Sequence, residues 1–176
     1  EAICDVRPTQ ASRMFNLDSA LPRSGLLHAL SGGRQASDLD DLLVLTAMGD
    51  CLLSVPYESA AEMAAAVLNP LPSPPSCESL EWPHLHRQAA LLAAALSTAL
   101  QRRSTGINVL LHGEPGTGKT AFARQLISQI GGSGFAIDHR DSQGDEATRS
   151  DRLANLRLSQ CFAGQHQSAV LVLDEA

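Results

Sequence analysis

The chain contains a single lysine, Lys119, while the other twelve of its 13 basic residues are arginines. That lysine lies in the segment Gly-Glu-Pro-Gly-Thr-Gly-Lys-Thr, which fits the phosphate-loop pattern of glycine, four residues, glycine, lysine and serine or threonine at every position. Backbone N–H groups of such a loop wrap around phosphates, and a compact ammonium reaches the terminal phosphates without the bulk of a guanidinium. The sequence therefore predicts a nucleotide-binding protein, whose ligand contacts Gly113, Glu114, Pro115, Gly116, Thr117, Gly118, Lys119, Thr120 and Ala121.

The segments on either side of this loop predict the secondary structure that a phosphate site requires. Residues 107–111, Ile-Asn-Val-Leu-Leu, form a short apolar run that is typical of a buried strand. Phe122, Leu126 and Ile130 recur at four-residue spacing and predict a helix over residues 121–130. The order of strand, loop and helix aims the N-terminus of the helix at the phosphates, which a chance match in a glycine-rich turn does not explain.

A second apolar run ends in two carboxylates. Residues 169–173 are all apolar and suit a parallel strand that is covered on both faces. Asp174 and Glu175 follow at the end of the strand where open α/β sheets place their ligands. We expect Asp174 to hold Mg²⁺ through water while the Thr120 hydroxyl binds the same ion directly. Glu175 would polarise the attacking water, so Glu175 and Lys119 are the predicted catalytic residues; an acidic strand end that merely faces solvent is the alternative.

These two motifs resemble those of the AAA+ ATPase family. The loop differs from the commonest family loop only in having Glu114 where proline is usual, and the Asp-Glu pair is similar to the Walker B motif. The resemblance covers residues 107–176, and the segment 106–111 is similar to bacterial members of the classical AAA group. It implies an α/β fold with the three-layer αβα core of P-loop NTPases. It also implies ATP and Mg²⁺ as ligands, a ring that is typically a hexamer, and an unknown protein substrate.

The resemblance also implies parts that lie beyond residue 176. A complete core has two more strands, a sensor residue, an arginine finger and a helical lid. The chain does not begin with methionine and stops directly after Glu175-Ala176, so we expect a core that is incomplete at its C-terminus. In the family, a later strand separates the two motif-bearing strands, and we expect residues 107–111 and 169–173 to be partly unpaired without it. The isolated chain is then expected to be poorly soluble, or a weak nucleotide binder without ATPase activity.

A proline-rich stretch divides the chain. Four prolines occur in the six residues 70–75, and they predict a stiff, extended linker without regular hydrogen bonding. The expected domains are a helical N-terminal region over residues 1–69, a linker over residues 70–79, and the first part of an ATPase domain over residues 80–176.

The N-terminal region carries no catalytic constellation, and we expect it to be a small adaptor or docking module. Its apolar pattern predicts helices over residues 38–53 and 59–68, with a third over residues 20–30. Ser37 or Asp38 is the expected N-cap of the first of these.

The remaining segments of the ATPase part are predicted from their local pattern. We expect a helix over residues 82–103, a strand over 135–138, a polar loop over 141–150 and a helix over 152–162. The polar loop lacks the aromatic residue with which protein-threading members of the family grip a chain, so this member does not thread polypeptide in that way or grips it elsewhere. Asp141 and Asp145 are either solvated or contacts to a substrate or subunit. By resemblance, Leu80, Trp82 and His84 are candidates to enclose the adenine, although helix packing is the favoured role.

Composition excludes several other classes of protein. The net charge of −6 and the absence of a basic stripe with aromatic residues argue against a nucleic-acid surface. The longest apolar stretch, residues 89–96, is too short to span a bilayer. His84 and His86 are expected at the surface. A reducing, cytoplasmic setting without zinc or disulfides fits the scattered cysteines, which are Cys4, Cys51, Cys77 and Cys161.

Two functional classes remain. The first and favoured class is an ATP-hydrolysing machine that works as a ring and remodels a protein or a complex. The second is a protein that binds nucleotide as a switch or scaffold without substantial hydrolysis. Glu175 favours the first class, because a pure binder does not need the base. A GTPase is disfavoured, since the Asp-Glu pair stands where Asp-x-x-Gly is expected.

Overall fold

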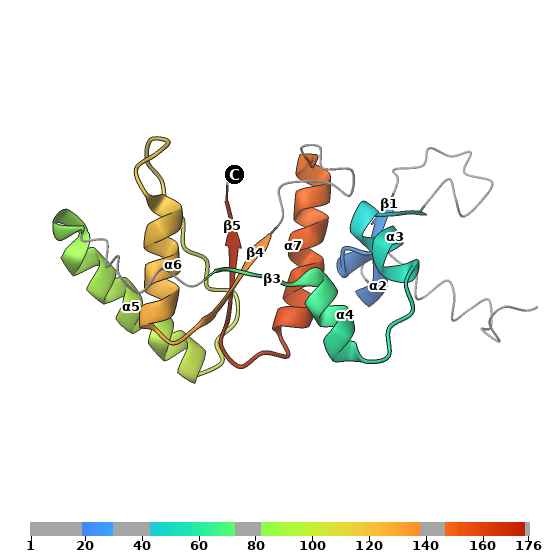
Figure 1. Cartoon of the computed structure of the whole chain (residues 1–176), viewed down its shortest axis with the longest axis horizontal. Helices are drawn as coiled ribbons and strands as arrows, with labels where there is room; N and C mark the ends of the chain where they lie inside the picture. Colours follow the sequence, from blue (N-terminus) through green and yellow to red (C-terminus); the bar gives the residue numbers. More distant parts are fainter. Residues whose placement is uncertain (1–18, 30–42, 73–81, 138–146, 175–176) are drawn as a thin grey trace, which may run out of the picture. The chain divides into compact units, whose positions relative to one another are not determined.

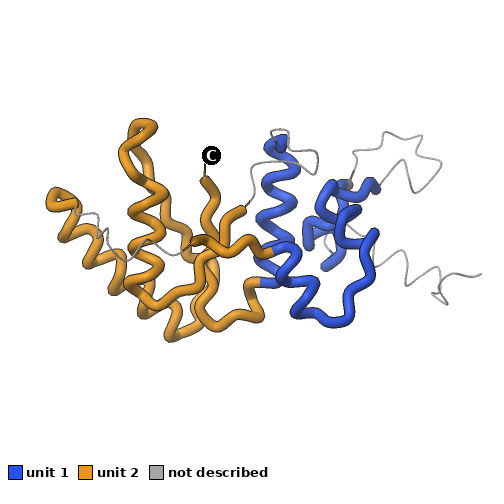
Figure 2. The backbone as a smooth tube through the Cα atoms, viewed as in Figure 1, with its two compact units in different colours: residues 1–67, 138–162 blue, residues 68–137, 163–176 orange. Residues whose placement is uncertain are grey.

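The computed structural model describes residues 19–29, 43–72, 82–137 and 147–174. The chain forms two compact units, which are coloured separately in Figure 2. Unit 1 comprises residues 1–67 and 138–162, and unit 2 comprises residues 68–137 and 163–176. Helices and strands are mixed along the chain, which is compatible with the predicted α/β class (Figure 1). Within the described ranges, no helix has the length and hydropathy needed to cross a membrane.

Unit 1 begins with a short helix and a two-stranded sheet. Helix α2 (Ala20–Arg23) is followed by β1 (Leu27–Ala29), which pairs antiparallel with β2 (Leu43–Leu45). The prediction of a helix over residues 20–30 is therefore wrong beyond its first turn. The cause lies at Gly25, whose positive φ of 86° ends the helical path and turns the chain into β1.

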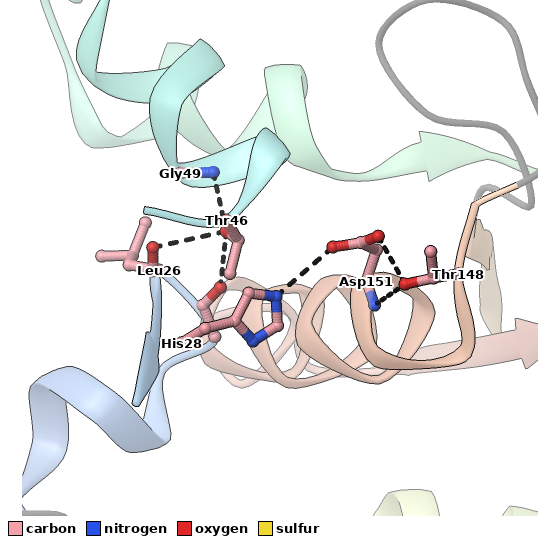
Figure 3. Close-up of polar contacts among 7 residues, drawn as sticks. Leu26, His28, Thr46, Gly49, Thr148 and Asp151 are labelled. Carbon is pink, nitrogen blue, oxygen red and sulfur yellow. Dashed lines mark hydrogen bonds and ion pairs between the residues drawn. The ribbon is translucent and has the colours of Figure 1, made fainter. Parts of the chain in front are cut away.

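The predicted helix over residues 38–53 starts later than expected. Strand β2 takes up residues 43–45, and helix α3 (Ala47–Leu53) begins only after Thr46. The Thr46 hydroxyl accepts a hydrogen bond from the Gly49 N–H at 3.0 Å, which makes Thr46 the N-cap (Figure 3). Residues 43–45 thus pair with β1 as a strand, although the spacing of the leucines predicted a helix there. The expected caps Ser37 and Asp38 lie outside the described residues.

The remaining helices of unit 1 share one apolar core. Helices α4 (Ala60–Val67) and α7 (Arg149–Ala163) confirm the predictions over residues 59–68 and 152–162. Leu52, Val67 and Leu158 form the buried centre, which joins α3 and α4 to α7. The partly buried residues packed against this centre are Leu26, Met48, Tyr57, Met63 and Phe162.

Unit 2 is built on a three-stranded sheet in the order β3-β4-β5. Strands β4 (Ser133–Ile137) and β5 (Ala169–Leu173) are parallel, with Ser133 opposite Ala169 and Ile137 opposite Leu173. They confirm the two predicted strands, although β5 is half-buried along its length rather than covered on both faces. The helices are α5 (His86–Gln101), preceded by the 3₁₀ turn η2 (Pro83–Leu85), and α6 (Lys119–Gln129), as predicted.

The first residues of the proline-rich stretch are hydrogen-bonded, which corrects the prediction of an unpaired linker there. Strand β3 (Asn69–Pro70) pairs antiparallel with β4, and the Leu71 N–H donates to the Gly134 carbonyl at 2.9 Å. Proline is tolerated at this position because β3 is an edge strand. Residues 73–81 lie outside the described part of the chain, and the division into domains at residues 70–79 stays a prediction.

Residues 107–111 do not form the predicted buried strand. The whole segment 104–114 has no helix or strand, and the exposed fraction is 51% for Ile107, 44% for Val109 and 83% for Leu110. A strand needs a neighbour for its backbone N–H and carbonyl groups. Within the described residues, β5 pairs with β4 alone and offers these residues no ladder. The local sequence has strand character, but the partner is not among these elements. The three-layer core stays a prediction.

Candidate functional site

The phosphate-loop motif forms a tight turn at the N-terminus of α6. Gly118 is the N-cap residue and has a left-handed conformation, with φ 84° and ψ 19°. Its carbonyl accepts the Phe122 N–H at 2.9 Å, so helical hydrogen bonding starts at the end of the motif. The first N–H groups of any helix lack partners within it, and the helix dipole adds a partial positive charge there. The motif therefore presents a helix terminus suited to an anion.

The Lys119 ammonium lies over the loop. Its Nζ donates to the carbonyl oxygens of Gly113 at 3.0 Å and Glu114 at 2.8 Å. The Thr117 hydroxyl also donates to the Glu114 carbonyl, at 2.8 Å. These three hydrogen bonds join the end of the loop to its beginning, and they keep the chain's single lysine close to the loop backbone. The remaining predicted loop residues, Pro115 and Gly116, are exposed, while Ala121 is half-buried in α6.

The structure brings the two motifs together. The Thr120 hydroxyl donates to Asp174 Oδ2 at 2.6 Å, although 54 positions separate these residues in the chain. Asp174 directly follows β5, and Thr120 is in the first turn of α6. A hydroxyl and a carboxylate are hard oxygen donors of the kind that Mg²⁺ prefers. The pair therefore fits the predicted magnesium site. Glu175, the predicted base, lies outside the described residues.

Trp82 also lies at the loop. The sequence favoured a role in helix packing for this residue and did not predict that it contacts the loop. A side-chain Cβ on Gly118 would lie 3.6 Å from Trp82 Cζ2 and 3.7 Å from Trp82 Nε1. The Trp82 and Phe122 rings are edge-on, with centroids 5.3 Å apart and planes 85° apart. Of the other two adenine candidates, His84 is exposed on η2 and Leu80 is outside the described residues. The signal in the sequence was the only tryptophan, placed just before a helix.

The described residues hold no second candidate site for a metal. No group of three or more His, Cys, Asp or Glu side chains gathers among them. Cys51 and Cys161 are free and exposed, whereas Cys4 and Cys77 lie outside the described ranges.

Comparison with known protein families identifies a match in the second half of the chain. Residues 109–176 match the family model described as the ATPase family associated with various cellular activities (AAA). The matched range begins inside the apolar run before the loop, and it includes both the loop and the Asp-Glu pair. No curated protein and no solved structure matches the chain.

Proposed function

Residues 109–176 belong to the AAA family of ATPases, as the two motifs predicted, and on that basis we propose that the protein binds ATP with Mg²⁺ and hydrolyses it. The observation that carries this proposal is the 2.6 Å hydrogen bond between Thr120 and Asp174. It joins the end of β5 to the first turn of the helix that follows the phosphate loop. Any phosphate bound at that helix terminus would lie next to a carboxylate, which is the arrangement that a nucleotide-bound cation requires.

Lys119 and the N-terminus of α6 would bind the terminal phosphates. The ammonium now contacts the Gly113 and Glu114 carbonyls, so it is within one side-chain movement of an anion in the loop. A hydrogen bond between two charged groups is about twice as strong as a neutral one, and phosphate oxygens would replace the carbonyls as acceptors. As the negative charge shifts during transfer, the fixed ammonium and backbone N–H groups would stabilise it.

Thr120 and Asp174 would hold Mg²⁺, the hydroxyl directly and the carboxylate through water. When bound, the ion neutralises charge on the β- and γ-phosphate oxygens. Glu175 directly follows Asp174 in the chain and is the residue that we assign to accept a proton from the attacking water. The division of roles follows the chemistry of the side chains, since binding needs Lys119 and the oxygen pair, and hydrolysis also needs the base.

We further propose that the ATPase works in a ring and remodels a protein or a complex. The family match supports this assignment, since AAA ATPases often assemble. The alternative is a nucleotide-binding switch or scaffold without substantial hydrolysis. The presence of Glu175 favours hydrolysis, and its substitution separates the two functions.

The binding proposal is tested at Lys119 in the full-length protein. Lys119→Ala should weaken ATP binding roughly 10- to 100-fold, the size of a hydrogen bond to a charged group. Lys119→Arg should also bind poorly, because the guanidinium is bulkier than the ammonium. Calorimetric titration with ATP measures both, and an unchanged ATP affinity for Lys119→Ala would remove the phosphate-loop assignment.

The hydrolysis proposal is tested at Glu175. Glu175→Gln should leave ATP affinity intact and slow phosphate release by roughly 10²-fold or more, the usual contribution of a positioned general base. Asp174→Asn is the matched comparison and should weaken magnesium-dependent binding together with hydrolysis. Hydrolysis at the wild-type rate in Glu175→Gln would assign the base to another residue, and absence of hydrolysis in the wild-type protein would favour the switch or scaffold.

A further inference from the structure

The only tryptophan of the chain packs against the turn that would hold the phosphates. The edge of its indole that carries Nε1 faces Gly118, where three ring atoms lie 3.6 to 4.0 Å from the position of a Cβ atom. Those separations are ordinary van der Waals contacts. Gly118 has no side chain that could pack against its neighbours and restrict its conformation. Its positive φ is only one of the backbone conformations that are open to glycine. The indole therefore packs beside a glycine that has no side chain to restrict its backbone conformation.

Trp82 is itself fixed from two directions. Its carbonyl accepts the Leu85 N–H at 2.9 Å, which starts η2 and leads directly into α5. Its ring also meets Phe122, one turn into α6, in an edge-on contact with centroids 5.3 Å apart. Such aromatic pairs add about 0.5–1.5 kcal/mol beyond the area that they bury. The indole thus links the start of α5 to the first turn of α6, and Gly118 lies at this junction.

We propose that Trp82 is a positioning residue of the phosphate loop, which holds Gly118 and the first turn of α6 in the conformation that binds a triphosphate. This inference rests on the proposed binding of ATP and names a residue that sets its strength. A loop that is already ordered loses less conformational entropy when the anion binds. The effect acts through Gly118 and Phe122. It therefore concerns the binding of the phosphate chain and is independent of the nucleobase of the ligand.

A ligand without a base separates this role from base stacking. Trp82→Ala in the full-length protein should weaken inorganic tripolyphosphate and a non-hydrolysable ATP analogue by the same factor, about tenfold, which corresponds to the upper end of an aromatic contact. Weaker binding of the ATP analogue alone would overturn the proposal in favour of stacking on the base. Unchanged affinity for both ligands would overturn it as well. If the wild-type protein bound neither ligand, the proposed function itself would fail.

Two further variants control for damage to the fold. Trp82→Phe keeps an aromatic ring beside Phe122 and should lose less affinity than Trp82→Ala, again equally for both ligands. Leu91→Ala lies on the same helix, α5, where Leu91 is 66% exposed, and should leave both affinities unchanged. A loss in Leu91→Ala equal to that in Trp82→Ala would mean that helix α5 as a whole, rather than the indole, supports the loop, and would overturn the proposal.

The wild-type protein offers a measurement that needs no substitution. Because Trp82 is the only tryptophan among these 176 residues, the tryptophan emission of a protein made of these residues reports on this position alone. Saturation with tripolyphosphate should shift or quench the emission, since it brings several negative charges close to the indole beside Gly118. Stacking of a nucleobase on Trp82 cannot cause this change in emission, because tripolyphosphate has no nucleobase. Emission that stays constant while calorimetry shows saturation would overturn the proposal.

Discussion

The two units use left-handed glycines for different purposes. Gly25 in unit 1 and Gly118 in unit 2 have nearly the same φ, 86° and 84°. A Cβ on Gly25 would collide with the Ala154 carbonyl oxygen, which is backbone of α7 and has little room to move. A Cβ on Gly118 would meet only Trp82, at an ordinary 3.6 Å. Unit 1 therefore needs glycine for close packing as well as for conformation, and the phosphate loop needs it for conformation alone.

The close packing at Gly25 connects the N-terminal region to a helix of the ATPase segment. Buried Thr46 donates its hydroxyl to the Gly25 carbonyl at 2.9 Å, and His28 Nε2 lies 3.3 Å from Asp151 Oδ1 at the start of α7 (Figure 3). Helix α7 lies within residues 109–176, the range that matches the AAA family. An adaptor or docking module formed by the N-terminal region would thus be carried on α7 rather than held only by the residues that join them in the chain.

Gly25→Ala is the substitution with the largest expected effect on stability. The added methyl group collides with backbone and also occupies a left-handed conformation, and we expect the free energy of unfolding of unit 1 to fall by about 3 kcal/mol. Hydrogen exchange of the α7 amides or denaturant unfolding measures the loss. Gly116→Ala has a similar φ, 78°, and no atom within 4 Å of its Cβ position, so it carries the conformational cost alone, about 1 kcal/mol. Equal losses in the two variants would show that packing at Gly25 contributes nothing.

Thr46→Ala should cost about 2 kcal/mol in unit 1. Thr46 is 2% exposed, and its hydroxyl both caps α3 through the Gly49 N–H and donates to the Gly25 carbonyl. The substitution removes an N-cap and leaves buried polar groups without their partner. Thr46→Ser retains the hydroxyl and is the matched control, which should stay within about 1 kcal/mol of the wild type in a thermal unfolding experiment. A Ser variant as unstable as the Ala variant would assign the loss to the methyl group instead of the hydrogen bonds.

The sequence predicted those parts whose signals are local. The phosphate loop, its helix and the strand before Asp174 each carry their own motif or apolar period, and the structure contains α6 and β5 as predicted. The predictions were wrong where the local structure depends on contacts with residues that are distant in the sequence. Strands β1 and β2 have three residues each and exist through their pairing with one another, which no local pattern reveals. Residues 107–111 have strand composition but no partner among the described elements, and Trp82 meets Gly118 only through the packing of α5 on α6.

Gly118→Ala should affect binding more than stability. Its methyl group has room, so the cost is the strain of the left-handed conformation, about 1 kcal/mol. Relaxation of this strain would tilt the first turn of α6, and we expect ATP affinity to fall by about fivefold while the unfolding midpoint changes little. Calorimetric titration together with thermal unfolding measures both quantities. Gly131→Ala is the control, since it also has a positive φ, 67°, and open space but lies beyond the far end of α6. An equal loss of ATP affinity in both variants would contradict a specific role of Gly118.

The smallest expected effect concerns the carboxylate that faces His28. The pKa of Asp151 is lowered from 3.8, mainly by the hydrogen bond from the Thr148 hydroxyl at 2.6 Å, with a smaller contribution from His28 and some opposition from burial. Because the folded pKa lies below the unfolded one, Asp151 stabilises unit 1 fully above pH 3.8, and this contribution is lost as the pH falls through the folded pKa. Asp151→Asn should therefore be less stable than the wild type at neutral pH, by less than about 1 kcal/mol for this partly exposed group, and the difference should shrink on acidification. Thermal unfolding at a series of pH values measures that difference. Thr148→Val should reduce the pH dependence more than His28→Gln does, and a larger effect of His28→Gln would show that the histidine, rather than the hydroxyl, dominates the pKa of Asp151.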